Sequence, residues 1–557
     1  MHALNSPFSK YIRFLTLFLV IHTAGASAQN GKSHPAPTVE MVAMRDSVKL
    51  ATSIFKFDST APGPAILIRT PSNHEDYQAE ISYFLEKRYH VIIQSTRGRN
   101  GSEGVDSLFF NDGWGEKQDG FDTVEWIAAQ AWNNGKVGTF GRGLDGFLQI
   151  LLAGSQPPNL TAQYIIAAPY NLYDHFVFPD GVWRKSLVEN SLEDLKADSL
   201  ISLFANNPAY SAFWTQLNGV RRAKAVNVPV AFVTGWYDAF NKGTIDAYRF
   251  IKKYGQDFAN DNVFLRVGPW TDNQSGFGKR RQGEFTFPEN AKFDVLADAG
   301  NWFDSWLKSS SESMMLEAPV KYYQMGAVDE AYAAGNIWQE ARQWPPAPKE
   351  IAKFYLAKDG GLRKNEIDKK GAAEGFMYDP ANPVPTRGGD NMFLEAGPMD
   401  QQNTESRKDV LIYTTDVLEA PVATAGRIRL KLFASSSAFD TDFTVKLTDV
   451  YPDGRSMLLT DGVVRARFRE SRTEPKLLKP KKVYEFWIDL GYTATVFNTG
   501  HKIRIAISSS NSPRFEPNPN SPEPFRQNAK AIIATNTVYF GGKRASYLEL
   551  PIVSLPE

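Results

Sequence analysis

The chain has 557 residues, too many for one ordinary domain, and its 42% hydrophobic and 13% aromatic content can fill several cores. Its 62 basic and 62 acidic residues give a formal net charge of zero, which argues against nucleic acid or an anionic membrane as the main partner. There is no cysteine, which excludes disulfides, thiolate metal sites, cysteine nucleophiles and lipobox lipid anchors.

The N-terminus has the order of a secretory signal peptide, which we assign to residues 1–28. Lys10 and Arg13 precede the apolar run 14–21, and residues 26–28 (Ala-Ser-Ala) have the A-x-A form of a cleavage site. The run is too short for a permanent membrane span, so an uncleaved anchor is the less favoured alternative. We expect an exported protein, periplasmic or extracellular, with no membrane contact after signal cleavage.

The region that follows alternates strand and helix signals, as an open α/β sheet requires. Residues 65–69 and 91–95 are apolar runs typical of strands buried on both faces of a parallel sheet. Asp122 and Glu125 have the spacing of a capping box and predict that a helix begins there.

The stretch 136–147 (KVGTFGRGLDGF) predicts a strand, a glycine-rich turn and an apolar helix beginning at Phe147. A strand that turns sharply into a helix is how α/β-hydrolases expose a nucleophile, normally the serine of G-x-S-x-G. Gly141 and Arg142 fit the first two positions, but Gly143 stands at the third. Glycine tolerates the strained backbone of such an apex and has no nucleophile. A plain strand-to-helix turn is the alternative interpretation.

The remaining chain divides by its periodicity. Residues 170–225 show helical periods only, which predicts a helical cap inserted over the ligand-binding edge of the sheet. The α/β alternation resumes over 226–345, so this segment and 39–169 form an α/β-hydrolase core. Beyond the proline-rich boundary at 344–348, about ten short strands with period-two alternation predict an all-β jelly-roll domain over 346–557.

The chain after the signal peptide resembles the cocaine esterase-like CocE/NonD hydrolases, relatives of X-Pro dipeptidyl-peptidases and α-amino-acid ester hydrolases. The resemblance is carried by motifs in matching order, among them Arg69-Thr-Pro71, 97–104 (RGRNGSEG), Gly235-Trp-Tyr-Asp238, Gly268-Pro-Trp270 and Ser508-Ser-Ser-Asn511. It implies a serine-hydrolase architecture with the same three parts, and it implies no cofactor and no metal.

The resemblance also implies which positions form the site. The family's serine lies in G-x-S-Y-x-G, its acid in G-W-Y-D and its histidine two residues after G-P-W, and a tyrosine in R-x-P-Y donates to the oxyanion. Asp238 matches the acid, whereas Gly143 stands at the serine, Asp272 at the histidine and Ser72 at the tyrosine. Leu144 follows the nucleophile position, and its backbone N–H is still able to point into the pocket. Three of the four side chains are therefore lost.

Serine acyl transfer needs a hydroxyl nucleophile and a base with a near-neutral pKa. Gly143 supplies no hydroxyl, and Asp272 supplies no such base. We considered Asp145 as a carboxylate nucleophile in a slipped elbow, and His74 as a base from the loop bordering the pocket; packed or exposed histidine is favoured for His74. Arg142 is the nearest basic residue in sequence, so we expect it to form a cluster with Asp238 and Asp272 and neutralise their charge. A site for a metal ion or a basic ligand is the more specific, less favoured alternative for this cluster.

Three functions remain open on these grounds. The first is a pseudoenzyme that binds a small-molecule or peptide ligand in the former acyl-hydrolase pocket. The second is an active ester or amide hydrolase, of aminoacyl or X-Pro dipeptidyl type, that uses displaced catalytic groups. The third and weakest is carbohydrate binding by the jelly roll. The sequence does not identify the ligand, and it is compatible with an oligomer.

Overall fold

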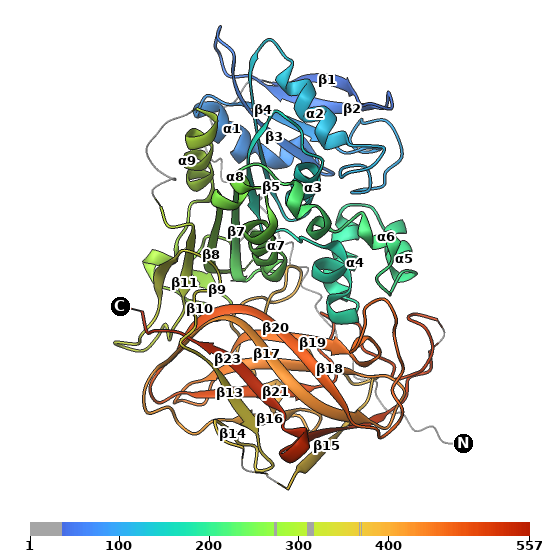
Figure 1. Cartoon of the computed structure of the whole chain (residues 1–557), viewed down its shortest axis with the longest axis vertical. Coiled ribbons are helices and arrows are strands. Elements are labelled where there is room, and N and C mark those ends of the chain that lie inside the picture. Colours follow the sequence, from blue (N-terminus) through green and yellow to red (C-terminus); the bar gives the residue numbers. More distant parts are fainter. Residues whose placement is uncertain are drawn as a thin grey trace, which may run out of the picture.

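A computed structural model describes residues 36–271, 276–308, 317–366, 368, 370–527 and 529–556. The predicted signal peptide and Asp272 lie outside these residues. An α/β part forms one end of the elongated molecule and a β-sandwich forms the other, with a group of short helices beside the junction (Figure 1). Among the described residues, the helices are all too short or too polar to cross a bilayer.

A ten-stranded sheet forms the centre of the α/β part, in the order β1-β2-β4-β3-β5-β6-β7-β8-β11-β12. Strands β3 to β8 and β11 pair in parallel, whereas β1, β2 and β12 run antiparallel to their neighbours. The β3, β4, β7 and β8 residues are buried throughout, which confirms the prediction of strands covered on both faces. The strands are β1 (Thr38–Ala43), β2 (Lys49–Phe55), β3 (Gly63–Thr70), β4 (His90–Ser95), β5 (Asn133–Arg142), β6 (Leu160–Ile166), β7 (Val230–Tyr237), β8 (Val263–Thr271), β11 (Val320–Gln324) and β12 (Ile337–Ala341).

Helices cover both faces of this sheet and bury a separate hydrophobic cluster on each. One face carries α1 (Gln78–Glu86) and α9 (Val295–Leu307). The other carries α2 (Asp119–Ala128), α3 (Leu144–Gly154) and α7 (Asn241–Tyr254). The smaller elements are α8 (Asp257–Asp261), η5 (Glu289–Ala291) and a hairpin of β9 (Arg281–Gln282) and β10 (Phe285–Thr286).

Two predicted helix starts were wrong. Helix α2 begins at Asp119, because Asp122 does not cap the helix but accepts hydrogen bonds from the backbone and guanidinium of Arg45, at 2.8 Å from the backbone nitrogen. Helix α3 begins at Leu144 rather than Phe147, because Gly143 is its N-cap and the chain turns there without an intervening loop.

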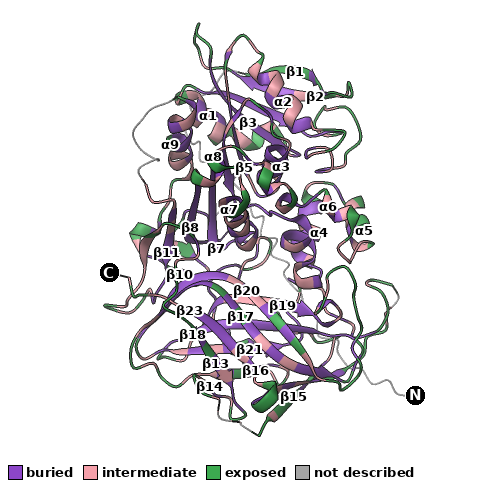
Figure 2. Ribbon diagram, in the orientation of Figure 1, coloured by how far each residue is buried: buried purple, intermediate pink, exposed green. Residues whose placement is uncertain are grey.

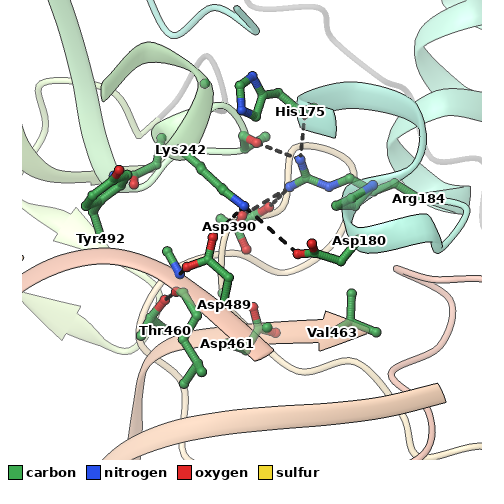
Figure 3. A pocket seen from close by; sticks show the side chains of 18 of the residues that line it. His175, Asp180, Arg184, Lys242, Asp390, Thr460, Asp461, Val463, Asp489 and Tyr492 are labelled. Carbon is green, nitrogen blue, oxygen red and sulfur yellow. Dashed lines mark hydrogen bonds and ion pairs between the residues drawn. The ribbon is translucent and has the colours of Figure 1, made fainter. Parts of the chain in front are cut away.

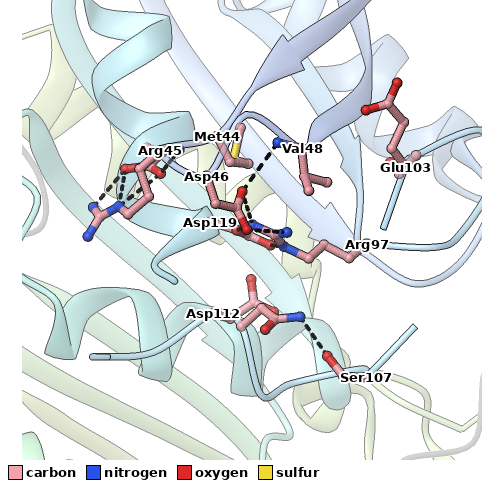
Figure 4. A network of polar contacts seen from close by, with 12 residues as sticks. Met44, Arg45, Asp46, Val48, Arg97, Glu103, Ser107, Asp112 and Asp119 are labelled. Atoms are coloured by element: carbon pink, nitrogen blue, oxygen red, sulfur yellow. Dashed lines mark hydrogen bonds and ion pairs between the residues drawn. The ribbon is translucent and has the colours of Figure 1, made fainter. Parts of the chain in front are cut away.

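The loop after β4 is fixed by buried ion pairs (Figure 4). Arg97 donates to Asp119 at 2.6 and 2.7 Å and to Asp46 at 2.8 Å through two nitrogens. Arg69, at the end of β3, pairs with Asp112, and both side chains are almost fully buried. Removing one partner of such a pair would leave an uncompensated buried charge, so this loop is held rigidly beside the sheet edge.

Short helices form the cap between β6 and β7. They are η2 (Tyr173–Val177), η3 (Pro179–Gly181), α4 (Lys185–Asp194), α5 (Ser199–Ala205), α6 (Ala212–Thr215) and η4 (Gly219–Ala225). Their aromatic side chains, including Phe178, Trp183, Phe204 and Trp214, pack with α3 in one cluster. The cap is therefore joined to the core by burial and not by a sheet.

The C-terminal part is a jelly-roll sandwich of a seven-stranded and a four-stranded sheet. Its elements are β13 (Glu350–Leu356), β14 (Leu362–Arg363), β15 (Ala372–Tyr378), α10 (Gln402–Glu405), β16 (Leu411–Thr414), β17 (Val422–Ser436), β18 (Asp442–Val450), β19 (Ser456–Arg465), η7 (Ala466–Phe468), β20 (Tyr484–Phe497), β21 (Lys502–Ser508), β22 (Ala534–Phe540), η8 (Gly542–Arg544) and β23 (Tyr547–Ile552).

Strands β17 and β20 have 15 and 14 residues, whereas the sequence predicted short strands. Strand β20 pairs with β17 as far as Phe497, and its residues Tyr492 and Ala494 also join the core of the α/β part. Figure 2 shows that buried residues run through both the central sheet and the sandwich strands. The two parts share a buried interface, because Ala425 and Met457 of the jelly roll also belong to the hydrophobic cluster of the α/β part.

Candidate functional site

The predicted elbow joins β5 to α3 at Gly143. This residue has φ 57° and ψ −120°, a backbone conformation that glycine adopts with little strain and other residues rarely adopt. Its backbone N–H donates to Ile166 O at 2.9 Å. Among the described residues, which exclude 272–275, no atom lies closer than 4.0 Å to a Cβ placed on Gly143, the nearest being Ala167 O and Phe240 Cε2. The described residues therefore leave room for a side chain at the apex.

The neighbouring glycines have a different reason to be glycine. A Cβ on Gly141 would lie 2.6 Å from Gln149 Nε2, and a Cβ on Gly146 would lie 2.8 Å from Ala168 Cβ. Close packing of α3 against the sheet thus requires glycine at these two positions. Steric crowding does not require it at Gly143, which distinguishes the apex from a plain glycine-rich turn.

Asp238 follows directly on β7 and is fully buried. Its carboxylate accepts from Thr234 Oγ1 and from the Phe240 backbone N–H, both at 2.6 Å. Because the Phe240 ring borders the apex of the elbow, the structure brings the Asp238 loop beside Gly143.

Asp272 lies outside the described residues, so its cluster with Asp238 and Arg142 stays a prediction. Tyr237, the last residue of β7, pairs with Thr271, the last residue of β8.

A carboxyl–phenol pair lies beside the elbow. Tyr77 Oη, from η1 (His74–Tyr77), donates to Asp145 Oδ2 at 2.5 Å and lies 2.7 Å from Thr70 Oγ1. The Ser72 backbone N–H donates to the same threonine oxygen at 3.0 Å, which links Asp145 to the loop of Ser72. Burial raises the pKa of Asp145 to about 7, against the hydrogen bonds from Tyr77 and Thr70, which lower it, and nearby Glu80 adds to the rise. Asp145 therefore changes charge near neutral pH.

Sequence reasoning missed Tyr77. The family's oxyanion tyrosine matches the position of Ser72, and Tyr77 lies five positions later. Only the turn of η1 brings the Tyr77 hydroxyl back to the elbow. Ser72 itself is half-buried, and its carbonyl accepts from Asn100 Nδ2 at 2.8 Å. Leu144 is half-buried at the first position of α3. The Arg142 guanidinium carbon lies 4.6 Å from the centre of the Phe277 ring.

His74 and His175, the histidines that flank the predicted pocket loops, interact with groups away from the elbow. His74 Nδ1 lies 3.4 Å from Ser53 Oγ on β2, which is three strands from β5, so the structure does not bring His74 to the elbow. His175 Nδ1 accepts the backbone N–H groups of Tyr170 and Asn171 at 3.2 and 3.1 Å, and its Nε2 lies 3.5 Å from Asp246. The His175 ring is thereby fixed in place and buried.

All three parts of the chain supply apolar side chains to one cluster at the elbow. Leu144 and Phe240 come from the core, Phe176 from the cap and Met392 from the C-terminal part. The rings of Phe176 and Phe240 are 6.2 Å apart. This hydrophobic cluster therefore draws on all three parts of the chain.

Beyond the Asp238 loop, the three parts enclose a cavity of about 80 Å³ with charged walls (Figure 3). Lys242 Nζ lies 2.5 Å from Asp489 and 4.0 Å from Asp180, and Arg427 donates to Asp489 at 2.7 Å. Burial raises the pKa of Asp489, but Lys242 and Arg427 outweigh it and hold this pKa far below its usual range. The charges neutralise one another, so the network fastens the parts together.

The fold and the site define an α/β-hydrolase with a helical cap and a C-terminal jelly roll. In the described residues, no group of three acidic, histidine or cysteine side chains is placed to hold a metal ion. The family profile of the X-Pro dipeptidyl-peptidase (S15 family) matches residues 46–197 and 184–272. That of the X-Pro dipeptidyl-peptidase C-terminal non-catalytic domain matches 313–549.

Cocaine esterase from Rhodococcus sp. is 30% identical to this chain over 92% of it and 98% of the relative. The crystal structure of an aminopeptidase from a marine sediment Thaumarchaeota archaeon has a TM-score of 0.79 at 25% identity, covering 94% of this chain and 98% of that one. An α-amino acid ester hydrolase has a TM-score of 0.81 at 23% identity, covering 95% and 100%. The chain belongs to the cocaine esterase-like CocE/NonD hydrolase family.

Proposed function

We propose that this protein binds a small-molecule or peptide ligand in the former acyl-hydrolase pocket and forms no acyl-serine intermediate. The observation that carries the proposal is the elbow, which keeps its strained backbone and its free space while the apex is Gly143. Covalent catalysis of this type requires a hydroxyl at the apex. The predicted signal peptide adds the proposal that the binding takes place outside the cytoplasm.

The surroundings of the elbow support binding. Leu144 and Phe240 place apolar side chains beside the apex, where an acyl or aromatic group of the ligand would pack. The Asp238 carboxylate accepts hydrogen bonds from Thr234 and from the Phe240 backbone N–H, and these stabilise the turn between β7 and α7.

The test is labelling of the purified mature chain with a fluorophosphonate probe, which reacts only with an activated serine. We expect no labelling, whereas an active family member run in parallel as the control should be labelled stoichiometrically. Stoichiometric labelling of Ser72, Ser95 or any other serine would show that the nucleophile has moved and would refute the proposal.

One observation favours a second candidate, hydrolysis by displaced groups. Asp145 is partly exposed and accepts a hydrogen bond from Tyr77, and its pKa of about 7 is one that a general base for water needs. Turnover of p-nitrophenyl butyrate with an inflection near pH 7, lost in Asp145→Asn and insensitive to fluorophosphonate, would support this candidate over simple binding.

A further inference from the structure

His501 lies between carboxylates from two parts of the chain. Its Nδ1 is 2.8 Å from Asp449 Oδ1, on β18 of the jelly roll. Its Nε2 is 3.0 Å from both carboxylate oxygens of Glu330, in the loop between β11 and β12 of the core sheet. The imidazole is fully buried, and the Tyr451 ring packs on it with the ring centres 4.4 Å apart.

This geometry determines the protonation state of the ring. An ionised carboxylate only accepts hydrogen bonds, and a neutral imidazole has a single N–H to donate. Both ring nitrogens of His501 face carboxylates, so only the imidazolium satisfies Asp449 and Glu330 together. Burial lowers the pKa of His501, but the hydrogen bonds to Asp449 and Glu330 outweigh it and raise this pKa above its ordinary value.

The other charged groups around the ring leave this balance unchanged. Asp329, next to Glu330, pairs with Arg455 at 2.7 Å, and the Arg455 guanidinium also pairs with Asp453 and covers the Tyr451 ring. Arg455 is thereby neutralised by its own partners. Glu330 and Asp449 are left to share the imidazolium.

The two carboxylates are not equally free to move. Asp449 is 5% exposed on a paired strand, whereas Glu330 is 29% exposed on a loop. The rest of the loop is held to the jelly roll by contacts that do not involve the imidazole, namely the Asp329–Arg455 ion pair and hydrogen bonds such as the Ala334 N–H donated to Asn498 Oδ1 at 2.8 Å. When the ring loses a proton, Nε2 becomes an acceptor facing another acceptor, and Glu330 is the partner that can turn away.

We propose that His501 is a proton-operated latch that holds the β11–β12 loop of the hydrolase core on the jelly roll and releases it as pH rises. The latch goes beyond ligand binding at the elbow and does not depend on it. Asp449 responds on the acid side, since burial raises its pKa to about 6, and its protonation leaves the Glu330 contact in place. Alkaline pH alone therefore opens the Glu330 side.

The test compares the full mature chain with Glu330→Gln. A glutamine amide accepts from the imidazolium and can also donate to the neutral ring, so it keeps the contact in both states. We measure hydrogen exchange of the amides in 326–336 at about pH 6.5 and pH 9, each normalised to the unfolded chain at the same pH. Loss of a charge-assisted bond predicts an approximately tenfold fall in wild-type protection over this range, and less than twofold in Glu330→Gln.

Asp329→Asn is the matched control, because it weakens a contact of the same loop that does not involve the imidazole. We expect it to lower protection equally at both pH values. The same fall for wild type and Glu330→Gln would overturn the proposal. In case the variant does not fold, spectra of the wild type labelled with ¹⁵N-histidine provide an independent test. A histidine with both ring nitrogens protonated at about pH 7 is expected, and its absence would refute the latch.

Discussion

Replacing Asp145 with asparagine tests the electrostatics of the elbow directly. Asparagine keeps a carbonyl oxygen for the Tyr77 hydroxyl but cannot ionise. Burial raises the pKa of Asp145 from 3.8 to about 7, so between these values the folded protein keeps a proton that the unfolded chain has released. The contribution of this carboxyl to stability is thus fully present below pH 3.8 and is lost as pH rises through about 7.

A rise of about three pKa units at 1.36 kcal/mol each gives an upper limit of about 4 kcal/mol. Asp145 is partly exposed, so we expect about 2–4 kcal/mol, which for a chain of 557 residues is a gain of roughly 2–4 °C in the Tm of Asp145→Asn over wild type at pH 8.

Scanning calorimetry of both proteins from pH 4 to pH 8 checks this expectation. The gap in Tm should be small at the acid end, widen toward neutral pH and stay constant above about pH 7.5. A gap that does not change with pH would show that Asp145 is ionised throughout, because the hydrogen bond from Tyr77 outweighs burial. The reasoning about a neutral carboxyl at the elbow would then be refuted.

Two further predictions concern the pocket and the core. Gly143→Ser alone should meet no close neighbour among the described residues but give no ester turnover. Adding Asp272→His and then Ser72→Tyr should give turnover of p-nitrophenyl butyrate, with strongly non-additive gains in rate. Failure of every combination in a folded protein would show that the pocket has been rebuilt. Burial, together with the nearby charge of Lys56, lowers the pKa of His90 from 6.5 to about 4 against the raising effect of a backbone hydrogen bond to Trp132, so wild type should lose up to about 3 kcal/mol as pH falls through this range. His90→Phe should abolish that loss in urea unfolding at pH 7 and pH 4.5, and an equal loss in both proteins would contradict the assignment.

Local patterns in the sequence predicted much of this architecture. The apolar runs gave the buried parallel strands, helical periods gave the cap, and the turn around Gly143 gave the elbow, because each depends on neighbouring residues. The contacts that give the site its present chemistry span long separations. Tyr77 and Asp145 are 68 positions apart, and Glu330 and His501 are 171 apart. Hydrophobic periodicity in the sequence does not predict such long-range pairs, so they could be found only in the folded structure.

The charged network at the junction has a consequence for how this chain can change over evolutionary time. A fragment ending at the proline-rich boundary would lack Asp489, so Lys242 would lose its nearest counter-ion together with the jelly-roll side chains that share its cavity. The jelly roll alone would lose Lys242 but keep the pair of Asp489 with Arg427. Neither piece is then a self-sufficient module that recombination could exchange, and substitutions at Lys242, Arg427 and Asp489 should be inherited together.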